Sequence, residues 1–202
     1  MKRFLILCFV FASCVTSALS QDSRCRLPLS RTANAQPAKV PADLAEQLLQ
    51  RAFKLMDTSA EDQRKILQDV KSGGVSGQFC AQTAQLKGTG APHLFIYFPS
   101  FCTSQNCPVW VYGHKGNEYE LLLEDVMVGE YNPGSRSGAV ILGTWTNGQR
   151  DLRLETLVSA YETEIRILKF DGQRYRARVC MSEKCLNGTK GCKETAHKCE
   201  TQ

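Results

Sequence analysis

The sequence predicts an α+β fold, in which an N-terminal helical pair packs on a twisted antiparallel β-meander that disulfides crosslink. Apolar residues recur at helical spacing between residues 41 and 73, apolar runs separated by turn residues fill residues 93–179, and eight cysteines follow a leader-like segment. The chain has 202 residues, of which 22% are charged and 43% hydrophobic. This balance is typical of a globular domain and excludes collagen-like, coiled-coil and wholly disordered chains.

Residues 1–20 have the features of a cleaved secretory signal peptide. A basic start precedes an apolar run over residues 4–15, and the small residues Ala18 and Ser20 precede the expected cleavage site. The run is too short to span a bilayer, which takes roughly 20 residues. We therefore expect a secreted or periplasmic protein without a transmembrane segment. The alternative is lipid anchoring through Cys14, because the residues before it resemble a lipobox.

The cysteines that follow this leader indicate a disulfide framework. An even number of cysteines in an oxidising compartment favours disulfides over free thiols. Cys102 and Cys107 bracket a short polar loop that brings their Cα atoms within reach of one another, so we expect them to pair. The alternative is zinc, with His197 as a further ligand, but no Cys-x2-Cys pair is present, and we expect neither a metal nor another cofactor. The eight are Cys25, Cys80, Cys102, Cys107, Cys180, Cys185, Cys192 and Cys199.

Two helices are expected after an irregular arm. The first begins at Pro41, because Leu44 and Leu48 continue an apolar stripe at helical spacing. Thr58 and Glu61 have the spacing of a capping box, which predicts that the second helix starts there. The chain then divides into a signal peptide over 1–20, an irregular arm over 21–40, a single α+β domain over 41–180 and a Cys-rich C-terminal tail over 181–202.

Strands dominate the second half of the chain. Turn-forming pairs separate the apolar runs, and the glycines at 116, 148 and 172 supply the positive φ values that tight hairpins need. Strands joined in this way are antiparallel neighbours, so we expect one meander of about six or seven strands. The expected strands cover residues 93–98, 109–112, 119–123, 139–145, 152–157, 165–168 and 175–179.

A weak internal repeat supports this arrangement. Residues 109–119 match residues 165–175 at an offset of 56, with the turn glycine and the following tyrosine in the same places. Two hairpins of similar design are therefore expected.

Three motifs between residues 85 and 180 carry a family resemblance. A Gly-rich loop leads into an apolar strand over 85–96, a paired-cysteine loop precedes a Trp-Val-Tyr strand over 102–112, and an Asp-Gly-x-x-Tyr hairpin closes the region over 170–180. In this order they resemble a group of small exported bacterial proteins of unknown function. The resemblance implies export but no established activity. The first loop also resembles the calcium loop of FG-GAP repeats, but it lacks the acidic residues that calcium needs.

A basic strand face is the surface that the sequence favours for binding. Arg174, Arg176 and Arg178 alternate along one strand, with Arg166 expected near them across the hairpin. Neighbouring like charges repel, and an anionic partner would relieve that repulsion. We therefore expect a non-enzymatic binding or structural protein whose partner is an anionic glycan, a lipid headgroup or an acidic protein. Nucleic acid is not expected, because the net charge of +5 falls to +3 without the two basic residues of the leader.

Two other functions stay open at this stage. Carboxylates cluster over residues 118–125, and paired carboxylates can divide the acid and base roles of a small secreted glycan hydrolase. The loop closed by Cys102 and Cys107 would be preorganised for docking, as in an inhibitor of a secreted enzyme. The carboxylates in question are Glu118, Glu120, Glu124 and Asp125.

Overall fold

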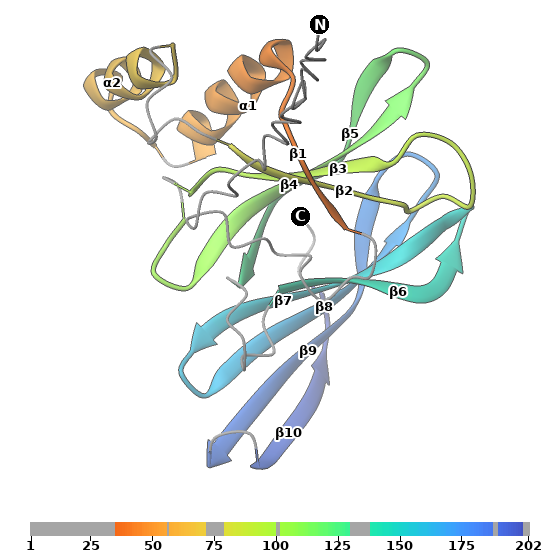
Figure 1. The fold of residues 1–202 in the computed structure, drawn as a ribbon. Coiled ribbons are helices and arrows are strands. Elements are labelled where there is room, and N and C mark those ends of the chain that lie inside the picture. Colours follow the sequence, from red (N-terminus) through yellow and green to blue (C-terminus); the bar gives the residue numbers. More distant parts are fainter. Residues whose placement is uncertain are drawn as a thin grey trace, which may run out of the picture.

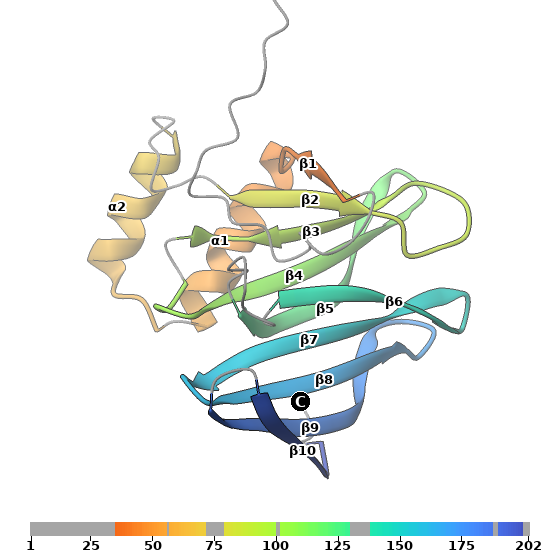
Figure 2. The same cartoon turned by 60° about the horizontal axis from the view of Figure 1, so that its bottom comes forward.

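The strands form two sheets. The structure, a computed structural model, shows two helices and ten strands in its described part, and the strands form two five-stranded antiparallel sheets (Figure 1, Figure 2). The prediction of one meander of about six or seven strands is therefore wrong in its sheet organisation. Both faces of the central strands are apolar, and a single sheet with helices on one side would leave the other face bare. The described residues are 35–55, 57–71, 79–99, 102–129, 138–187 and 190–199.

Sheet A contains the first five strands in their chain order. The three predicted strands in this region are present: β4 and β5 are longer than expected, and β3 ends one residue earlier, whereas β1 and β2 were not predicted. β1 pairs with β2 through Pro37 and Gln82, so part of the expected irregular arm is an edge strand. An edge position tolerates proline because the missing N–H faces away from the sheet. The strands are β1 (Gln36–Ala38), β2 (Cys80–Ala84), β3 (His93–Tyr97), β4 (Asn106–Lys115) and β5 (Glu118–Gly129).

Sheet B contains the last five strands, also in chain order. The boundary expected at residue 181 falls inside β9, because β9 and β10 form a hairpin that continues the sheet to residue 197. The C-terminal cysteines therefore crosslink paired strands instead of an irregular tail. The strands are β6 (Gly138–Thr146), β7 (Gln149–Ser159), β8 (Glu162–Phe170), β9 (Tyr175–Asn187) and β10 (Lys190–His197).

The hairpin turns follow the predicted glycines. Gly116 between β4 and β5 has φ 64°, and Gly172 between β8 and β9 has φ 109°. Asn147 and Gly148 have φ 48° and 77°, which is the pair of positive values that a two-residue hairpin turn requires. The local turn chemistry was therefore predicted correctly.

The two helices precede β2. α1 (Ala42–Leu55) starts next to Pro41, as the sequence predicted. α2 (Ala60–Lys71) begins one residue later than expected, because the capping side chain is Ser59. The Ser59 hydroxyl accepts the N–H of Asp62 at 3.2 Å, as an N-cap does, and donates to the Asp62 carboxylate at 2.7 Å.

Sheet A is covered on both faces. Leu94 and Ile96 of β3 pack with Trp110 on the side of α1, whereas the alternate residues Phe95 and Tyr97 face sheet B. α2 contributes two partly buried side chains, Ile66 and Leu67, to the α1 side. Figures 1 and 2 show α1 and sheet B on opposite sides of sheet A. The α1-side cluster contains Leu44, Leu48, Leu49, Phe53, Ala81, Leu94, Ile96, Phe98, Trp110 and Tyr112.

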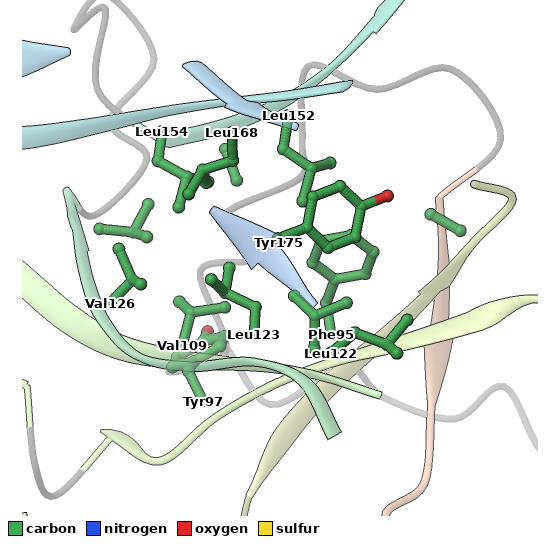
Figure 3. Close-up of a cluster of buried hydrophobic side chains, with 14 of the residues drawn as sticks. Phe95, Tyr97, Val109, Leu122, Leu123, Val126, Leu152, Leu154, Leu168 and Tyr175 are labelled. Carbon is green, nitrogen blue, oxygen red and sulfur yellow. The ribbon is translucent and has the colours of Figure 1, made fainter. Parts of the chain in front are cut away.

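The inter-sheet core joins the two sheets. Sheet B contributes Leu152 and Leu154 from β7 and Leu168 from β8, all at most 1% exposed. Figure 3 shows these side chains facing those of sheet A, including Phe95 and Val109. Burial of this apolar surface is the main favourable term that holds the sheets together.

The sequence repeat extends over two four-stranded meanders. An offset of 56 carries Asn106–Lys115 of β4 onto 162–171, and β8 spans Glu162–Phe170. The same offset places β5 on β9, β3 within β7, and β2 on the start of β6. The matched hairpins at 109–119 and 165–175 are therefore β4–β5 and β8–β9, as expected.

Three disulfides join described cysteines. The predicted pair Cys102–Cys107 is confirmed, and the others are Cys180–Cys199 and Cys185–Cys192. Cys80 is also disulfide-bonded, to a partner outside the described residues. Among the described residues, neither helix is long and apolar enough to cross a membrane.

Candidate functional site

The candidate site is a pocket of about 320 Å³ on the inner face of sheet B. On β7 the inner face runs from the core residues Leu152 and Leu154 to Thr156 and Val158, because alternate strand residues share a face. The same face of sheet B is therefore apolar where sheet A covers it and polar beyond. The pocket is lined by Thr156, Val158, Glu164, Arg166, Ala177, Cys180, His197 and Lys198.

Strand pairing places these residues side by side. Thr156 of β7 lies opposite Glu164 of β8, and Arg166 of β8 lies opposite Cys180 of β9. Cys180 in turn lies opposite His197 of β10. Four adjacent strands thus form a continuous floor, and the backbone ladder fixes the spacing of its side chains.

The edge of sheet A limits the pocket on one side. The Thr156 hydroxyl donates to the carbonyl of Met127 in β5 at 2.5 Å. One residue further on, Asn106 at the start of β4 bonds both backbone groups of Leu157, at 2.8 Å each. These contacts hold the end of β7 against sheet A and mark where its coverage of sheet B stops.

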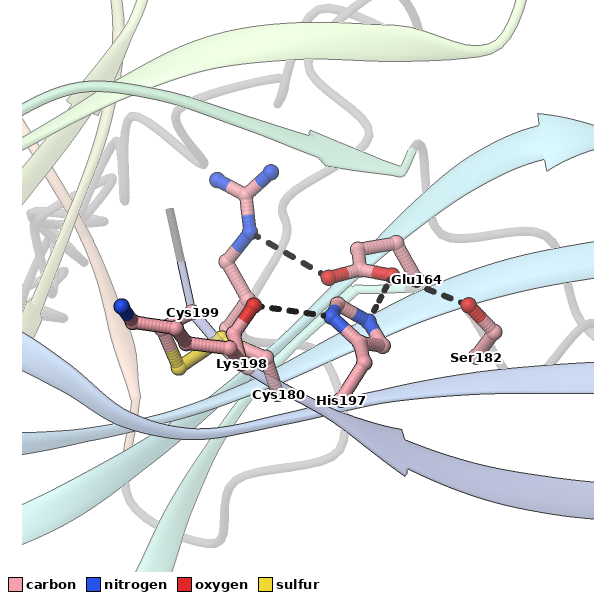
Figure 4. Close-up of a disulfide and its surroundings, with 7 residues drawn as sticks. Glu164, Cys180, Ser182, His197, Lys198 and Cys199 are labelled. Carbon is pink, nitrogen blue, oxygen red and sulfur yellow. Dashed lines mark hydrogen bonds and ion pairs between the residues drawn. A yellow bond between two sulfur atoms is a disulfide. The ribbon is translucent and has the colours of Figure 1, made fainter. Parts of the chain in front are cut away.

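Glu164 is the centre of the polar cluster in this pocket. His197 Nε2 lies 3.1 Å from Glu164 Oε2, and the hydroxyl of Ser182 donates to the same oxygen at 3.4 Å (Figure 4). Arg166 Nε lies 3.9 Å from the other oxygen, Oε1. The Glu164 side chain is 16% exposed, so it is shielded by its partners but still reaches solvent.

The hydrogen bonds of His197 favour its charged form. Its Nδ1 lies 3.1 Å from the carbonyl oxygen of Lys198, and its Nε2 faces the carboxylate of Glu164. Both neighbours are acceptors, and a neutral imidazole carries only one N–H. The arrangement is therefore complete only when both ring nitrogens are protonated. In that state three positive groups, those of Arg166, His197 and Lys198, line the pocket together with a single carboxylate.

Two of these cations remain open to a ligand. Across the described ranges of the chain, no hydrogen bond or ion pair occupies the terminal nitrogens of Arg166 or the ammonium group of Lys198. Arg166 is 29% exposed and can turn these nitrogens toward a molecule in the pocket. A guanidinium in this position is suited to two parallel bonds with one anionic group.

A disulfide fixes the rim of the pocket. Cys180 lines the floor and is bonded to Cys199, with a Cα–Cα distance of 5.2 Å (Figure 4). This bond holds the chain after β10 against β9, and with it the neighbouring Lys198. The position of a cation at the rim therefore depends on a covalent link.

The four arginines that the sequence favoured do not share one face. Arg166 lies opposite Cys180 on the inner face, whereas Arg176 lies opposite Lys169 on the outer face. The register shift between Ile167 and Leu168 is the cause: a β-bulge places one extra residue, Arg178, in β9 and reverses the alternation beyond it. The prediction that Arg166 and Arg176 lie close together on one face is therefore wrong.

The other two arginines near the β8–β9 turn have acidic neighbours. Arg176 pairs with Asp171 at 3.4 Å, and Arg174 pairs with Glu124 of β5 at 3.9 Å. Backbone N–H groups of Arg174 and Gln173 donate to Asp171 Oδ1 and lower the pKa of that carboxyl. These charges are thus partly balanced within the turn.

The carboxylates over 118–125 are dispersed along β5. Glu118 is exposed, and Glu120 pairs with Lys115 at 4.0 Å. Glu124 pairs with Arg174 and with Arg51 of α1, a contact that ties the helix to the sheet. The side chain of Asp125 lies outside the described residues. This arrangement supplies charge pairs between elements and does not favour the hydrolase interpretation.

The Cys102–Cys107 loop is exposed at its tip. Residues 103–105 are exposed, and the loop is closed by a bond from the N–H of Thr103 to the carbonyl of Asn106 at 2.7 Å. The loop is therefore a tight, crosslinked turn before β4, and residues 100–101 beside it lie outside the described part.

A possible metal group coincides with a disulfide. Ligand atoms of Glu183, Cys185 and Cys192 lie within 4.8 Å of one another. The two sulfurs are bonded to each other, however, and a metal requires thiolates. His197 faces Glu164 instead of this group. The geometry therefore does not favour the zinc alternative.

A second polar cluster lies inside the inter-sheet core. His93 is 1% exposed, and burial lowers its pKa to about 4, with smaller contributions from Lys87 and His114. Nearby, the Tyr175 hydroxyl lies 3.1 Å from Gln149 Oε1 and 2.9 Å from the carbonyl of Arg150. Burial, with a smaller effect of Asp151, raises the pKa of Tyr175. These groups are neutral at physiological pH and closed to a ligand, so we regard the cluster as structural.

Sequence reasoning singled out only Arg166 as a binding residue of the pocket. Glu164 was visible as a charge near it, but Thr156, Ser182 and Lys198 had no distinguishing motif. The usable signal was the change along β7 from leucine at alternate positions to threonine.

Comparisons with known proteins do not identify this arrangement. No family model matches the chain, and neither a curated protein nor a solved structure shows significant similarity to it.

Proposed function

We propose that this chain is an exported, non-enzymatic binding protein that takes an anionic ligand into the pocket of sheet B. The observation that carries the proposal is the convergence of Arg166, His197 and Lys198 on one pocket with a single carboxylate, Glu164. An excess of positive charge in a partly enclosed space attracts anions and strengthens their hydrogen bonds.

Export is supported by the covalent framework. Three disulfides join described cysteines, and a fourth involves Cys80. Such density is typical of proteins that fold in an oxidising compartment. The leader-like residues 1–20 give an independent reason to expect secretion or a periplasmic location.

The pocket favours a small anionic group over a flat partner. Its cations lie on the inner face of sheet B, next to the edge of sheet A, where a broad acidic surface could not approach. The anionic group of a glycan can enter such a site, and the polymer can extend outward from the rim. The partner is therefore still anionic, as expected from the sequence, but its proposed site is the pocket and not the exposed arginines near the β8–β9 turn.

Calorimetric titration with a polyuronate, a sulfated glycan fragment and inorganic phosphate tests the proposal. We expect at least one of them to bind, and a double variant, Arg166→Gln with Lys198→Gln, to lose about tenfold or more in affinity. The matched control is Arg176→Gln with Arg178→Gln, which removes the same charge from exposed arginines of β9 that do not line the pocket and should leave affinity within about twofold. Stronger loss in the control pair, or no binding by any probe, would refute the pocket as the site.

A further inference from the structure

We infer that the ligand is a sugar ring that carries one negative charge, as in a uronate or a sulfate monoester, and not a phosphate. This inference rests on the proposed function, and it adds the chemical class of the ligand. It follows from the position of Glu164 among the cations and from the hydroxyl and apolar groups around it.

Glu164 limits the charge that the pocket accepts. Its carboxylate, with Arg166, His197 and Ser182 as neighbours, places a negative charge beside the cations of the pocket. A doubly charged phosphate would be repelled by this carboxylate. A singly charged group can pair with the free nitrogens of Arg166 and Lys198 at a smaller repulsive cost.

The same carboxylate supplies an acceptor for hydroxyl groups. Ser182 and His197 contact Oε2, whereas among the described residues Oε1 has Arg166 Nε as its neighbour, at 3.9 Å. A carboxylate oxygen accepts two hydrogen bonds, so Oε1 has room for a donor from the ligand. A sugar ring offers several such donors, whereas doubly ionised inorganic phosphate keeps a single P–OH group.

One further hydroxyl extends this polar side. The Thr156 hydroxyl donates its proton to the Met127 carbonyl and keeps lone pairs for a ligand hydroxyl. Ser182 does not line the pocket, and its bond to Glu164 helps to orient the carboxylate. Thr156 and Glu164 lie opposite each other on β7 and β8, and these neighbouring acceptors match a ring with several hydroxyls.

The pocket also has apolar groups beside its polar ones, and these suit the ring of a sugar. Val158, which is 59% exposed, lies with Ala177 and the Cys180 half-cystine around the pocket. An inorganic anion gains nothing from these apolar groups, whereas the C–H side of a sugar ring can cover them. The volume of about 320 Å³ also lies at the small end of ligand pockets.

Calorimetry with four matched probes tests this inference on the intact oxidised protein. The probes are methyl glucuronoside, methyl glucoside, methyl glucoside 6-sulfate and inorganic phosphate. We expect the charged sugars to bind at least about tenfold more tightly than either the neutral sugar or phosphate, since each lacks one of the two interactions. The uronate and sulfate arms distinguish the two sources of the single charge.

The variant Glu164→Gln separates charge from shape. It removes the repulsion, so we expect phosphate affinity to rise by about tenfold while the preference over phosphate shown by the charged sugars collapses. Arg176→Gln is the control on the outer face, and circular dichroism checks that the variants stay folded. Phosphate binding as tightly as the uronate would overturn the inference and leave the proposed function in place, whereas the neutral sugar binding as tightly as the uronate would overturn both. No binding in any arm would overturn both.

Discussion

The two sheets use the same strand order for different purposes. Sheet A is apolar on both faces, because α1 covers one and sheet B the other. Sheet B is apolar on its inner face only as far as Leu154 and then becomes polar at Thr156. Sheet A therefore has both faces covered, whereas sheet B leaves part of its inner face free for a site.

One pair of equivalent positions shows the difference. The offset of 56 that relates the hairpins carries Trp110 of β4 onto Arg166 of β8. Trp110 is fully buried under α1, whereas Arg166 is 29% exposed in the pocket. The same place in the meander thus holds the largest buried side chain of one sheet and the central cation of the other.

The largest expected effect is on the stability of sheet A. Trp110→Ala removes a fully buried indole and leaves a cavity, which should lower the free energy of unfolding by about 4 kcal/mol. The matched control is Trp145→Ala in sheet B, whose ring is 52% exposed beside Arg150 and should cost less than about 1 kcal/mol. Denaturant unfolding measures both, and equal losses would contradict the division between the sheets.

The second largest expected effect is the loss of stability on removing a disulfide from sheet B. Replacing Cys180 and Cys199 by serine opens a 19-residue link and should cost about 3 kcal/mol. Replacing Cys102 and Cys107 opens a 5-residue link before β4 and should cost about 2 kcal/mol. Hydrogen exchange gives the sharper test: β10 should lose protection only in the first variant. Equal protection of β10 in both would show that this disulfide does not hold the rim.

The buried histidine makes the inter-sheet core sensitive to acid. The pKa of His93 is about 4 in the folded protein, compared with about 6.5 in an unfolded chain, so the unfolded state takes up a proton first. Stability should therefore fall as the pH drops from about 6.5 to about 4, by a total of about 3 kcal/mol.

Comparison of wild type with His93→Gln isolates this effect. Unfolding free energies at neutral pH and near pH 4 should differ less in the variant, whatever its absolute stability. His114→Gln is the control, because this side chain is only partly buried and contributes less than burial to the lowered pKa of His93, so the variant should keep most of the wild-type pH dependence. An unchanged pH dependence in His93→Gln would locate the acid sensitivity elsewhere.

The smallest expected effect concerns the charge pairs that connect the elements. Glu124 pairs with Arg51 of α1 and with Arg174 beside sheet B, and all three side chains are at least one-third exposed. Solvent screens such pairs, so Glu124→Gln should cost less than about 1 kcal/mol. Denaturant unfolding at low and high salt measures this, and a loss comparable to that of Trp110→Ala would mean that charge, not apolar burial, joins the parts.

Sequence reasoning succeeded where the physics is local. The turn at Asn147 and Gly148, the start of α1 and the Cys102–Cys107 link depend on a few neighbouring residues. The predicted start of α2 differs from the observed one by one residue, because Thr58 and Ser59 can each act as an N-cap.

Sequence reasoning failed where contacts between distant segments determine the structure. No sequence pattern between β5 and β6 indicates that the chain passes from sheet A to sheet B. Predicting that change requires knowledge of which segments cover each face of the sheets. The side of Arg166 depends on a bulge opposite Ile167, and a bulge reverses every residue beyond it. The pocket follows from both facts, so only Arg166 among its binding residues was anticipated.

The two disulfides of the β9–β10 hairpin are nested, and this has a consequence for oxidative folding. Cys185 lies directly opposite Cys192, inside the link from Cys180 to Cys199. Four cysteines can pair in three ways, but once the strands meet in register only one way joins neighbours. Closing either bond brings the other two sulfurs together, so this hairpin should oxidise correctly without reshuffling by an isomerase.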